Sequence, residues 1–239
     1  MKKIFTLLAL IISFNVNAQV STNSTSPAGI YASAMGNGTT ASGNESTAMG
    51  YDTTASGEAS TAMGYKTTAS AQGSTAMGKL TTASDFASVV IGQYNSSGSS
   101  ATSANSFSTS APAFVIGNGT ASNAKSDAFK VMFNGDATVS NDLTVSGDVN
   151  ITSDARLKTN IVSLGSTLSK LLQIDGKSYE MKGKQKIGVL AQEIQEVFPE
   201  LVSEDDNEML AVNYQGLVPV LINALKEQES KIIDQQTQI

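Results

Sequence analysis

Residues 46–59 read STAMGYDTTASGEA, and two near copies follow, STAMGYKTTASAQG (60–73) and STAMGKLTTASDFA (74–87). A shorter copy, SAMGNGTTASGNE (33–45), precedes them, and SVVIG (88–92) keeps the spacing. Two sets of residues mark the unit: glycines at every fourteenth position (Gly36, Gly50, Gly64, Gly78, Gly92) and alanines at every seventh (Ala34, Ala41, Ala48, Ala55, Ala62, Ala69, Ala76, Ala83). The chain therefore contains a fourteen-residue internal repeat.

This repeat predicts β-structure. A heptad of small residues could form an alanine coiled coil, but a Gly and a Thr-Thr pair in each unit oppose a helix, and charged flanking positions are missing. Residues seven apart in a strand point to opposite faces, so each half-unit needs a turn to bring the same face inward. Each unit then forms one coil of a β-roll. We expect Thr, Ser, Asn and Glu outside, and an interior of the alanines with Met35, Met49, Met63 and Met77.

Such a coil is thin. One chain of small residues buries little apolar area, so a roll of this kind is stabilised when several chains lie side by side.

The N-terminus, MKKIFTLLALIISFNVNAQ, has the pattern of a secretory signal peptide at residues 1–18. Two lysines precede an apolar run from Ile4 to Phe14, and Val16 and Ala18 stand at the small-residue positions of a cleavage site. We expect cleavage after Ala18 and export to the extracellular space or the bacterial cell surface. The apolar run is too short to cross a bilayer, and no later segment is long enough, so we expect no transmembrane segment in the mature chain.

The composition disfavours several classes of function. The 239 residues include no His and no Cys, which removes the commonest metal sites and His-based catalytic triads, so we expect no cofactor and no metal. An exported chain without disulfides needs a large core or partner chains. A net charge of -6 without a basic patch argues against nucleic-acid binding. An enzyme acting on an external substrate is disfavoured, because the repeats offer no paired carboxylates in a plausible pocket.

The chain after the signal peptide divides into three parts. The repeats occupy 19–122, with a Ser-rich interruption at 94–111, a connector follows at 123–152, and a C-terminal domain covers 153–239. The connector sequence AFKVMFNGDATVSNDLTVSGDVNI (128–151) alternates apolar and polar residues, with NGD and SGD as turns. It predicts half-buried β-structure.

From residue 153 the composition shifts to Leu, Ile, Val, Lys and Glu, and the pattern predicts a small mixed α/β domain. LGSTLSKLLQI (164–174) has helical spacing, with Ser166 or Thr167 available as a cap. KSYEMKGKQKIGVLA (177–191) reads as two strands around a turn, and AQEIQEVFPELV (191–202) as a short helix.

VSEDDNEMLAVNY (202–214) suits a hairpin with an acidic tip from Glu204 to Glu208. This tip lacks the Gly and the twelve-residue ligand spacing of a calcium loop, so we expect a solvated turn. The final segment, 214–239, predicts a helix with a weak coiled-coil seam, because Gln228 and Gln235 interrupt it. Its apolar positions are Val218, Leu225, Ile232 and Ile239, spaced by seven, with Leu221 beside them. This helix suits the stalk of an oligomer that other contacts already hold.

The repeated motif STAMGYxTTASG resembles the head repeat of trimeric autotransporter adhesins, the YadA-like heads. The resemblance covers Tyr31 to Gly92, with an echo in FVIGNGTAS from Phe114 to Ser122. It implies a trimeric left-handed β-roll on a bacterial surface. The C-terminal membrane barrel of those adhesins is not seen in this sequence.

The C-terminal half resembles the intramolecular chaperone domain of endosialidases and other phage tailspikes. SDARLKTNI, IGVLAQEIQEVFPELV and VNYQGLVPVLINALKEQ occur in the family's order and spacing. The resemblance implies a domain that trimerises, ends in a trimeric coiled-coil helix, guides folding of the β-rich passenger and then releases itself by autoproteolysis. The Ser/Lys dyad of the family corresponds to Ser153 and Lys158.

The residues around the dyad are compatible with this chemistry. A Ser hydroxyl needs a base, and Lys158 can serve if burial or nearby positive charge lowers its pKa. Arg156 could supply such charge, and Asp154 could orient the turn or the ammonium. Attack on the carbonyl of Thr152 closes a five-membered ring, so we favour scission between Thr152 and Ser153; attack from a neighbouring chain would cut between Ser153 and Asp154 instead.

These expectations combine into a secreted, adhesin-like homotrimer that carries its own cleavable chaperone. Its partner would be a receptor or a glycan on a host or other surface. The alternatives are a phage tail-fibre component that binds a host receptor, against which the signal peptide argues, and a structural surface protein that is not cut.

Overall fold

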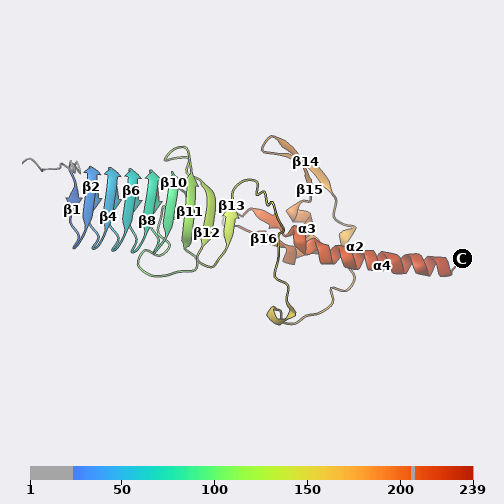
Figure 1. Cartoon of the computed structure of the whole chain (residues 1–239). Coiled ribbons are helices and arrows are strands. Elements are labelled where there is room, and N and C mark those ends of the chain that lie inside the picture. The colour runs from blue at the N-terminus through green and yellow to red at the C-terminus, as the bar shows by residue number, and fades with distance from the viewer. Residues whose placement is uncertain (1–23, 206–207, 239) are drawn as a thin grey trace, which may run out of the picture. The chain divides into compact units, whose positions relative to one another are not determined.

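The computed structural model describes residues 24–205 and 208–238. The predicted signal peptide lies outside these residues. The chain forms two compact units, residues 1–149 and 150–239, which we call the head unit and the C-terminal unit (Figure 1).

The head unit is a β-solenoid in which each repeat supplies one five-residue and one two-residue strand (Figure 1). The long strands form a parallel array: β2 (Ser33–Asn37), β4 (Thr47–Tyr51), β6 (Thr61–Tyr65), β8 (Thr75–Lys79), β10 (Val89–Gln93) and β11 (Pro112–Asn118). The short strands form a second parallel sheet: β1 (Ser26–Pro27), β3 (Thr40–Ala41), β5 (Thr54–Ala55), β7 (Thr68–Ala69) and β9 (Thr82–Ala83). The predicted β-roll is confirmed, while its left-handed winding and trimeric assembly stay predictions.

The coils stack in strict fourteen-residue register. Ala62 pairs with Ala48 on one side and Ala76 on the other, and Met63 lies between Met49 and Met77. The alanines from Ala41 to Ala83 are fully buried and form one continuous core, which Val90 and Val115 extend. The alanine part of the predicted interior is therefore confirmed.

The predicted placement of Met, Thr and Ser is wrong in part. Successive side chains of a strand point to opposite faces, so Ala48 points inward while Thr47 and Met49 lie half-buried on the outer face. Ser46, at the preceding turn, is buried, and its Oγ donates to the Gly43 carbonyl at 2.6 Å. The first residue of each Thr-Thr pair is fully buried as well: Thr39, Thr53, Thr67 and Thr81. The interior is thus lined by Ala, Ser and Thr, and the methionines form an outer row.

The repeated glycine is required by the close approach of successive coils. Gly64 has φ +124°, and a Cβ there would lie 2.1 Å from the carbonyl oxygen of Gly78. Any other residue would face both an unfavourable backbone conformation and a steric clash with the next coil.

The Ser-rich interruption at 94–111 closes the end of the small sheet. Asn95 is fully buried, and its amide accepts from Thr82 N at 2.8 Å and donates to the Thr82 carbonyl at 2.9 Å. The carboxylate of buried Asp85 accepts from the backbone N–H groups of Thr102 and Ser103. Asn95 thus occupies the pairing groups of β9 that a further coil would use, which protects an exposed sheet edge.

The connector contains less β-structure than predicted. β12 (Asp127–Met132) pairs antiparallel with β11 and with β13 (Ala137–Val139). Within the described chain, residues 140–154 form no strand, and Leu143, Val145, Val149 and Ile151 are exposed. A strand forms only where a neighbouring strand pairs with its backbone, and among the described residues no strand lies beside 143–151.

The C-terminal unit mixes short strands and helices, as predicted. It contains two hairpins, β14 (Lys177–Met181) with β15 (Lys184–Gly188) and β16 (Val202–Glu204) with β17 (Leu210–Val212), and the helices α2 (Leu168–Leu171), α3 (Ala191–Val197) and α4 (Leu217–Thr237). Short 3-10 turns stand at Ala155–Leu157, Pro199–Leu201 and Tyr214–Gly216. The core is small, centred on Ile194, Phe198 and Val220.

The predicted capping of α2 is right in its position and wrong in its hydrogen bond. Thr167 precedes α2 but caps it with no side-chain hydrogen bond. The carboxylate of Glu227, on α4, accepts instead from the N–H groups of Thr167 and Leu168 and from the Ser166 hydroxyl. These hydrogen bonds, first those from Thr167 N and Ser166, lower the pKa of Glu227.

Helix α4 carries two apolar faces. Val220 and Ala224 are buried against the unit, whereas Val218, Leu221, Leu225 and Ile232 of the predicted seam are exposed. Ile239 lies outside the described residues. Among the residues that the structure describes, none of the helices is long and apolar enough to cross a membrane.

Candidate functional site

Ser153 and Lys158 are brought into contact by a single 3-10 turn. The turn spans Ala155–Leu157, and the N–H of Lys158 donates to the Ala155 carbonyl at 3.1 Å. This reversal carries the Lys158 side chain back along the chain, so that Nζ donates to Ser153 Oγ at 2.6 Å. The two groups of the predicted dyad therefore stand in the geometry that a proton transfer between them needs.

Asp154 and Arg156 shape the turn between them. Asp154 caps it, because its Oδ1 accepts from Arg156 N at 2.8 Å, and its Oδ2 accepts from the guanidinium Nη2 of Arg156 at 2.7 Å. The Arg156 side chain and then its N–H lower the pKa of Asp154, and Asp154 in turn raises the pKa of Arg156. Asp154 therefore orients the turn, and it compensates the positive charge of Arg156 that Lys158 would otherwise experience.

The whole loop is exposed in the single chain. All residues from Thr152 to Asn160 are exposed, Ser153 and Lys158 included. A shallow hollow of about 370 Å³ lies beside the dyad, lined by Thr152, Asp154, Arg156 and Leu157. Both side chains of the dyad are therefore open to solvent in the single chain.

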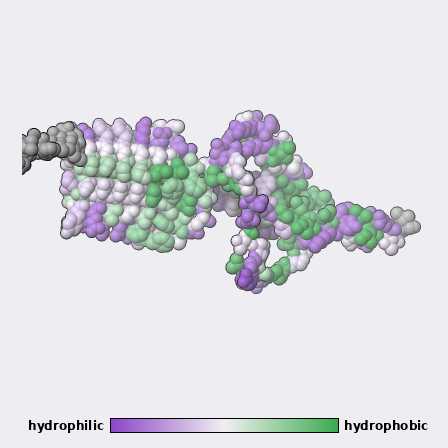
Figure 2. All heavy atoms as spheres, in the orientation of Figure 1, coloured by the Kyte–Doolittle hydropathy of each residue, from purple (hydrophilic) through white to green (hydrophobic). Residues whose placement is uncertain are grey.

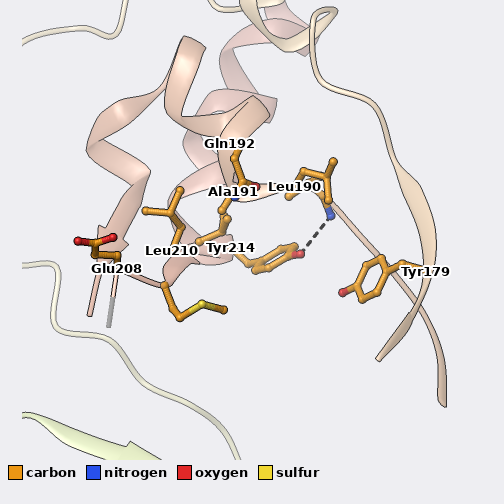
Figure 3. Close-up of a pocket in the computed structure, with 10 residues that line it drawn as sticks. Tyr179, Leu190, Ala191, Gln192, Glu208, Leu210 and Tyr214 are labelled. Carbon is orange, nitrogen blue, oxygen red and sulfur yellow. Dashed lines mark hydrogen bonds between the residues drawn. The ribbon is translucent and has the colours of Figure 1, made fainter. Parts of the chain in front are cut away.

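A second hollow lies in the C-terminal unit, between the β14–β15 hairpin and α3 (Figure 3). It measures about 330 Å³ and is lined by apolar side chains, by two tyrosines, Tyr179 and Tyr214, and by Gln192 and Glu208. Tyr214 Oη accepts from Val189 N at 3.2 Å, and a Cβ at Gly188 would lie only 2.6 Å from that oxygen. The tyrosines thus occupy the space that a side chain at residue 188 would take.

The sequence did not predict a role for Tyr179, Tyr214 or Glu227. Alternation in 177–191 predicted the hairpin but gave no contact between distant segments, and Glu227 looked like any exposed charge on a helix. The acidic tip from Glu204 to Glu208 includes residues 206 and 207, which the structure does not describe, so the solvated turn stays a prediction. Among the residues that the structure describes, no three potential metal ligands of the types His, Cys, Asp or Glu lie close enough together to hold a metal ion.

Comparison with protein families gives two matches, one in each unit. The YadA head domain repeat matches twice, at residues 28–53 and 55–81. The chaperone of endosialidase matches residues 153–203, which include Ser153, Asp154, Arg156 and Lys158. No curated protein matches the chain.

The two matches define a class of protein: an adhesin-like head followed by an intramolecular chaperone domain. Residues 28–81 are similar to YadA head repeats, and residues 153–203, after them, are similar to the chaperone of endosialidase. Both resemblances noted in the sequence are thereby confirmed, in the same order along the chain.

Proposed function

We propose that this protein is an exported homotrimer at the bacterial surface whose C-terminal unit aligns three chains and then releases itself by autoproteolysis. The observation that carries the proposal is the contact of 2.6 Å between Lys158 Nζ and Ser153 Oγ at the start of the segment that matches the chaperone of endosialidase. The head repeats would bind a receptor or a glycan on another surface.

Trimer formation is supported by the apolar surface that one chain leaves uncovered. The outer face of the large sheet carries the row Met35, Met49, Met63, Met77 and Ile91, and an apolar band crosses its strands in Figure 2. Helix α4 exposes its predicted seam as well, with Leu225 72% exposed. Monomers rarely expose contiguous apolar surface of this kind without a partner.

Assembly would also supply what the dyad lacks. Packing of neighbouring chains over the loop would remove water from Lys158, and burial favours the neutral amine that can accept a proton. The exposed dyad of a single chain and the buried dyad of a trimer would then differ in activity, so cutting would follow assembly.

The cleavage step is an acyl shift followed by hydrolysis. Lys158 Nζ takes the proton of Ser153 Oγ, and Oγ attacks the carbonyl carbon of Thr152. The C–N bond between Thr152 and Ser153 breaks, the nitrogen of Ser153 leaves as an amine after protonation, and Thr152 is held as an ester on Oγ. Water then hydrolyses this ester and regenerates the hydroxyl. In the alternative, the Ser153 hydroxyl of a neighbouring chain attacks the carbonyl carbon of Ser153 in this chain. The chain is then cut between Ser153 and Asp154.

The test is the intact mass of purified protein after a time course. The parent chain should separate into two fragments, and the masses identify the cut on either side of Ser153. Ser153→Ala and Lys158→Ala should be cut at least about 10³-fold more slowly, because each removes one half of the dyad. Ser163→Ala, in the same exposed loop, serves as the matched control and should be cut like the parent. Equal cutting of Ser153→Ala and the parent would refute this role for the dyad.

A further inference from the structure

The connector contains a second, shorter repeat. Residues 131–154 divide into four six-residue units, VMFNGD, ATVSND, LTVSGD and VNITSD. Four of the six positions keep their character: the first is apolar, the third is Phe, Val or Ile, the fourth is Asn, Ser or Thr, and the sixth is always Asp. The fifth is occupied by Gly135, Asn141, Gly147 and Ser153 in turn. We call these units hexads.

The structure shows what the end of a hexad does. The first hexad ends in the turn between β12 and β13, where Gly135 has φ +95°. Asp136 N donates to Asn134 Oδ1 at 2.9 Å, and Asn134 Nδ2 donates to Asp136 Oδ2 at 2.8 Å. The chain bends again at Ser140–Asn141 and at Ser146–Gly147, the same two positions of the next hexads. The first three hexads thus each end in a turn or a bend, whereas residues 152–153 of the fourth form neither in the single chain.

The apolar residues of the hexads can line up in one row, and those of hexads two to four are uncovered in the single chain. The first and third positions lie on the same face of an extended chain, and an even period repeats that face in each unit. In hexads two to four these side chains are 40% to 71% exposed for Val139, Leu143, Val145, Val149 and Ile151. Extended stretches of three residues bury too little to be stable alone, and only Ala137–Val139 has a partner strand in the described chain.

We propose that hexads two to four, residues 137–154, pair with the same hexads of other copies of this chain and form a shared β-stalk. A copy of the same segment matches the six-residue spacing of the apolar rows at every unit. The acidic sixth positions, Asp142, Asp148 and Asp154, lie outside the apolar rows, so the like charges of neighbouring copies point away from the seam. The number of copies, three, rests on the proposed function; the pairing itself does not.

The hexad register also gives Ser153 a structural position. Ser153 stands at the fifth position of the last hexad, where the earlier hexads have Gly or Asn at a turn. The bond between Thr152 and Ser153 would thus lie after the last strand of the stalk, outside its paired residues. A cut there would remove the C-terminal unit and leave the apolar strands of the stalk with the head.

The experiment uses the absence of native Cys. In the full-length chain, Val145→Cys places a thiol in the apolar row, and Thr144→Cys, one residue away, places it on the opposite face. Under mild oxidation most Val145→Cys chains should run as disulfide-linked dimers on a non-reducing gel, because thiols of paired copies come within bonding distance, whereas Thr144→Cys should stay monomeric on that gel. Equal cross-linking of the two variants, or none in either, would overturn the stalk.

Hydrogen exchange on the unmodified protein gives a second measurement that needs no substitution. The amides from Thr144 to Ile151 should be protected in the assembled protein, and exchange at the rate of an unstructured peptide would contradict the pairing. The intact masses of the same samples show whether the chain has been cleaved. Cross-linking without cleavage would support the stalk and refute self-cleavage, and cleavage without cross-linking or protection would do the opposite.

Discussion

Replacing Ala62 by Leu tests whether the interior of the head is as narrow as the structure indicates. Ala62 is fully buried, and its neighbours in the stacked strands are Ala48 and Ala76, in direct register. Adjacent strands are about 4.8 Å apart, so the alanine methyl groups already fill the space between coils. The buried alanines of the short strands close the interior from the other side.

The magnitude follows from this lack of space. Leucine adds three carbon atoms, which must displace a neighbouring coil or force the side chain into a strained rotamer. Overpacking of a dense core costs about 1–3 kcal/mol, and we expect the upper end, about 3 kcal/mol, because the neighbours in register are Ala and the rest of the interior is lined by Ala, Ser and Thr. For a chain of this size that loss corresponds to a fall in melting temperature of about 6–12 °C.

Thr68→Leu is the matched control. Thr68 lies on β7 of the same solenoid but is half-buried on the outer face, between buried Thr67 and Ala69. Its substitution should change the free energy of unfolding by no more than about 0.5 kcal/mol. Both variants are melted by circular dichroism at one protein concentration, because assembly makes the melting temperature depend on concentration. Equal melting temperatures for the two variants would show that the alanine column is not the tight interior.

Two further substitutions probe other features. Gly64→Ala should lower the melting temperature clearly more than Gly135→Ala, although both glycines have positive φ. A Cβ meets the Gly78 carbonyl oxygen at the first site and open space at the second. Similar losses in thermal melts would argue against the contact between coils. Glu227→Gln should destabilise the protein at about pH 7 and much less at about pH 3. The pKa of Glu227 is lower in the folded than in the unfolded chain. The stabilisation from its carboxylate is therefore present above the unfolded-state pKa and is lost as the pH falls through the folded-state pKa. A stability difference that is constant with pH in denaturant titrations would count against the helix cap.

The repeat allowed the solenoid to be predicted, but its inner and outer faces only in part. The seven-residue spacing identified the alanine column correctly. It did not distinguish Met49 from Ser46 as an interior residue, because hydrophobicity favours Met whereas the strand period and the width of the coil favour Ser. Ser46 is accommodated because its hydroxyl bonds to the Gly43 carbonyl within the turn. Local hydrogen bonding therefore decided a choice that hydrophobicity alone answers incorrectly.

The C-terminal unit was predictable to the level of its elements. Alternation and helical spacing gave the two hairpins and the helices α3 and α4, since these signals are local. The cap of α2 was not predictable, because Glu227 is sixty residues from Thr167 and only the packing of α4 against α2 brings them together. Ser153 and Lys158 were named from a family resemblance, and their contact depends on a turn that the sequence shows only as Asp154 followed by Arg156.

The repeats themselves explain why a non-repetitive domain should follow them. The strands β4 and β6 are identical, TAMGY, and β8 differs from them only in its last residue. If neighbouring chains slip by one coil, the outer methionine rows still meet their equivalents, so most contacts between chains survive and the free-energy penalty is confined to the coils that differ. The degeneracy is broken only where the repeat changes, at Lys79 in β8 and at Val90 and Val115, which continue the alanine column. A register chosen so weakly within the head must be set from outside it, and only a domain whose sequence does not repeat can specify a single alignment. The C-terminal unit meets this condition, and if it is released by a cut at Ser153 after assembly, as proposed above, the coils have already paired and the head keeps its register.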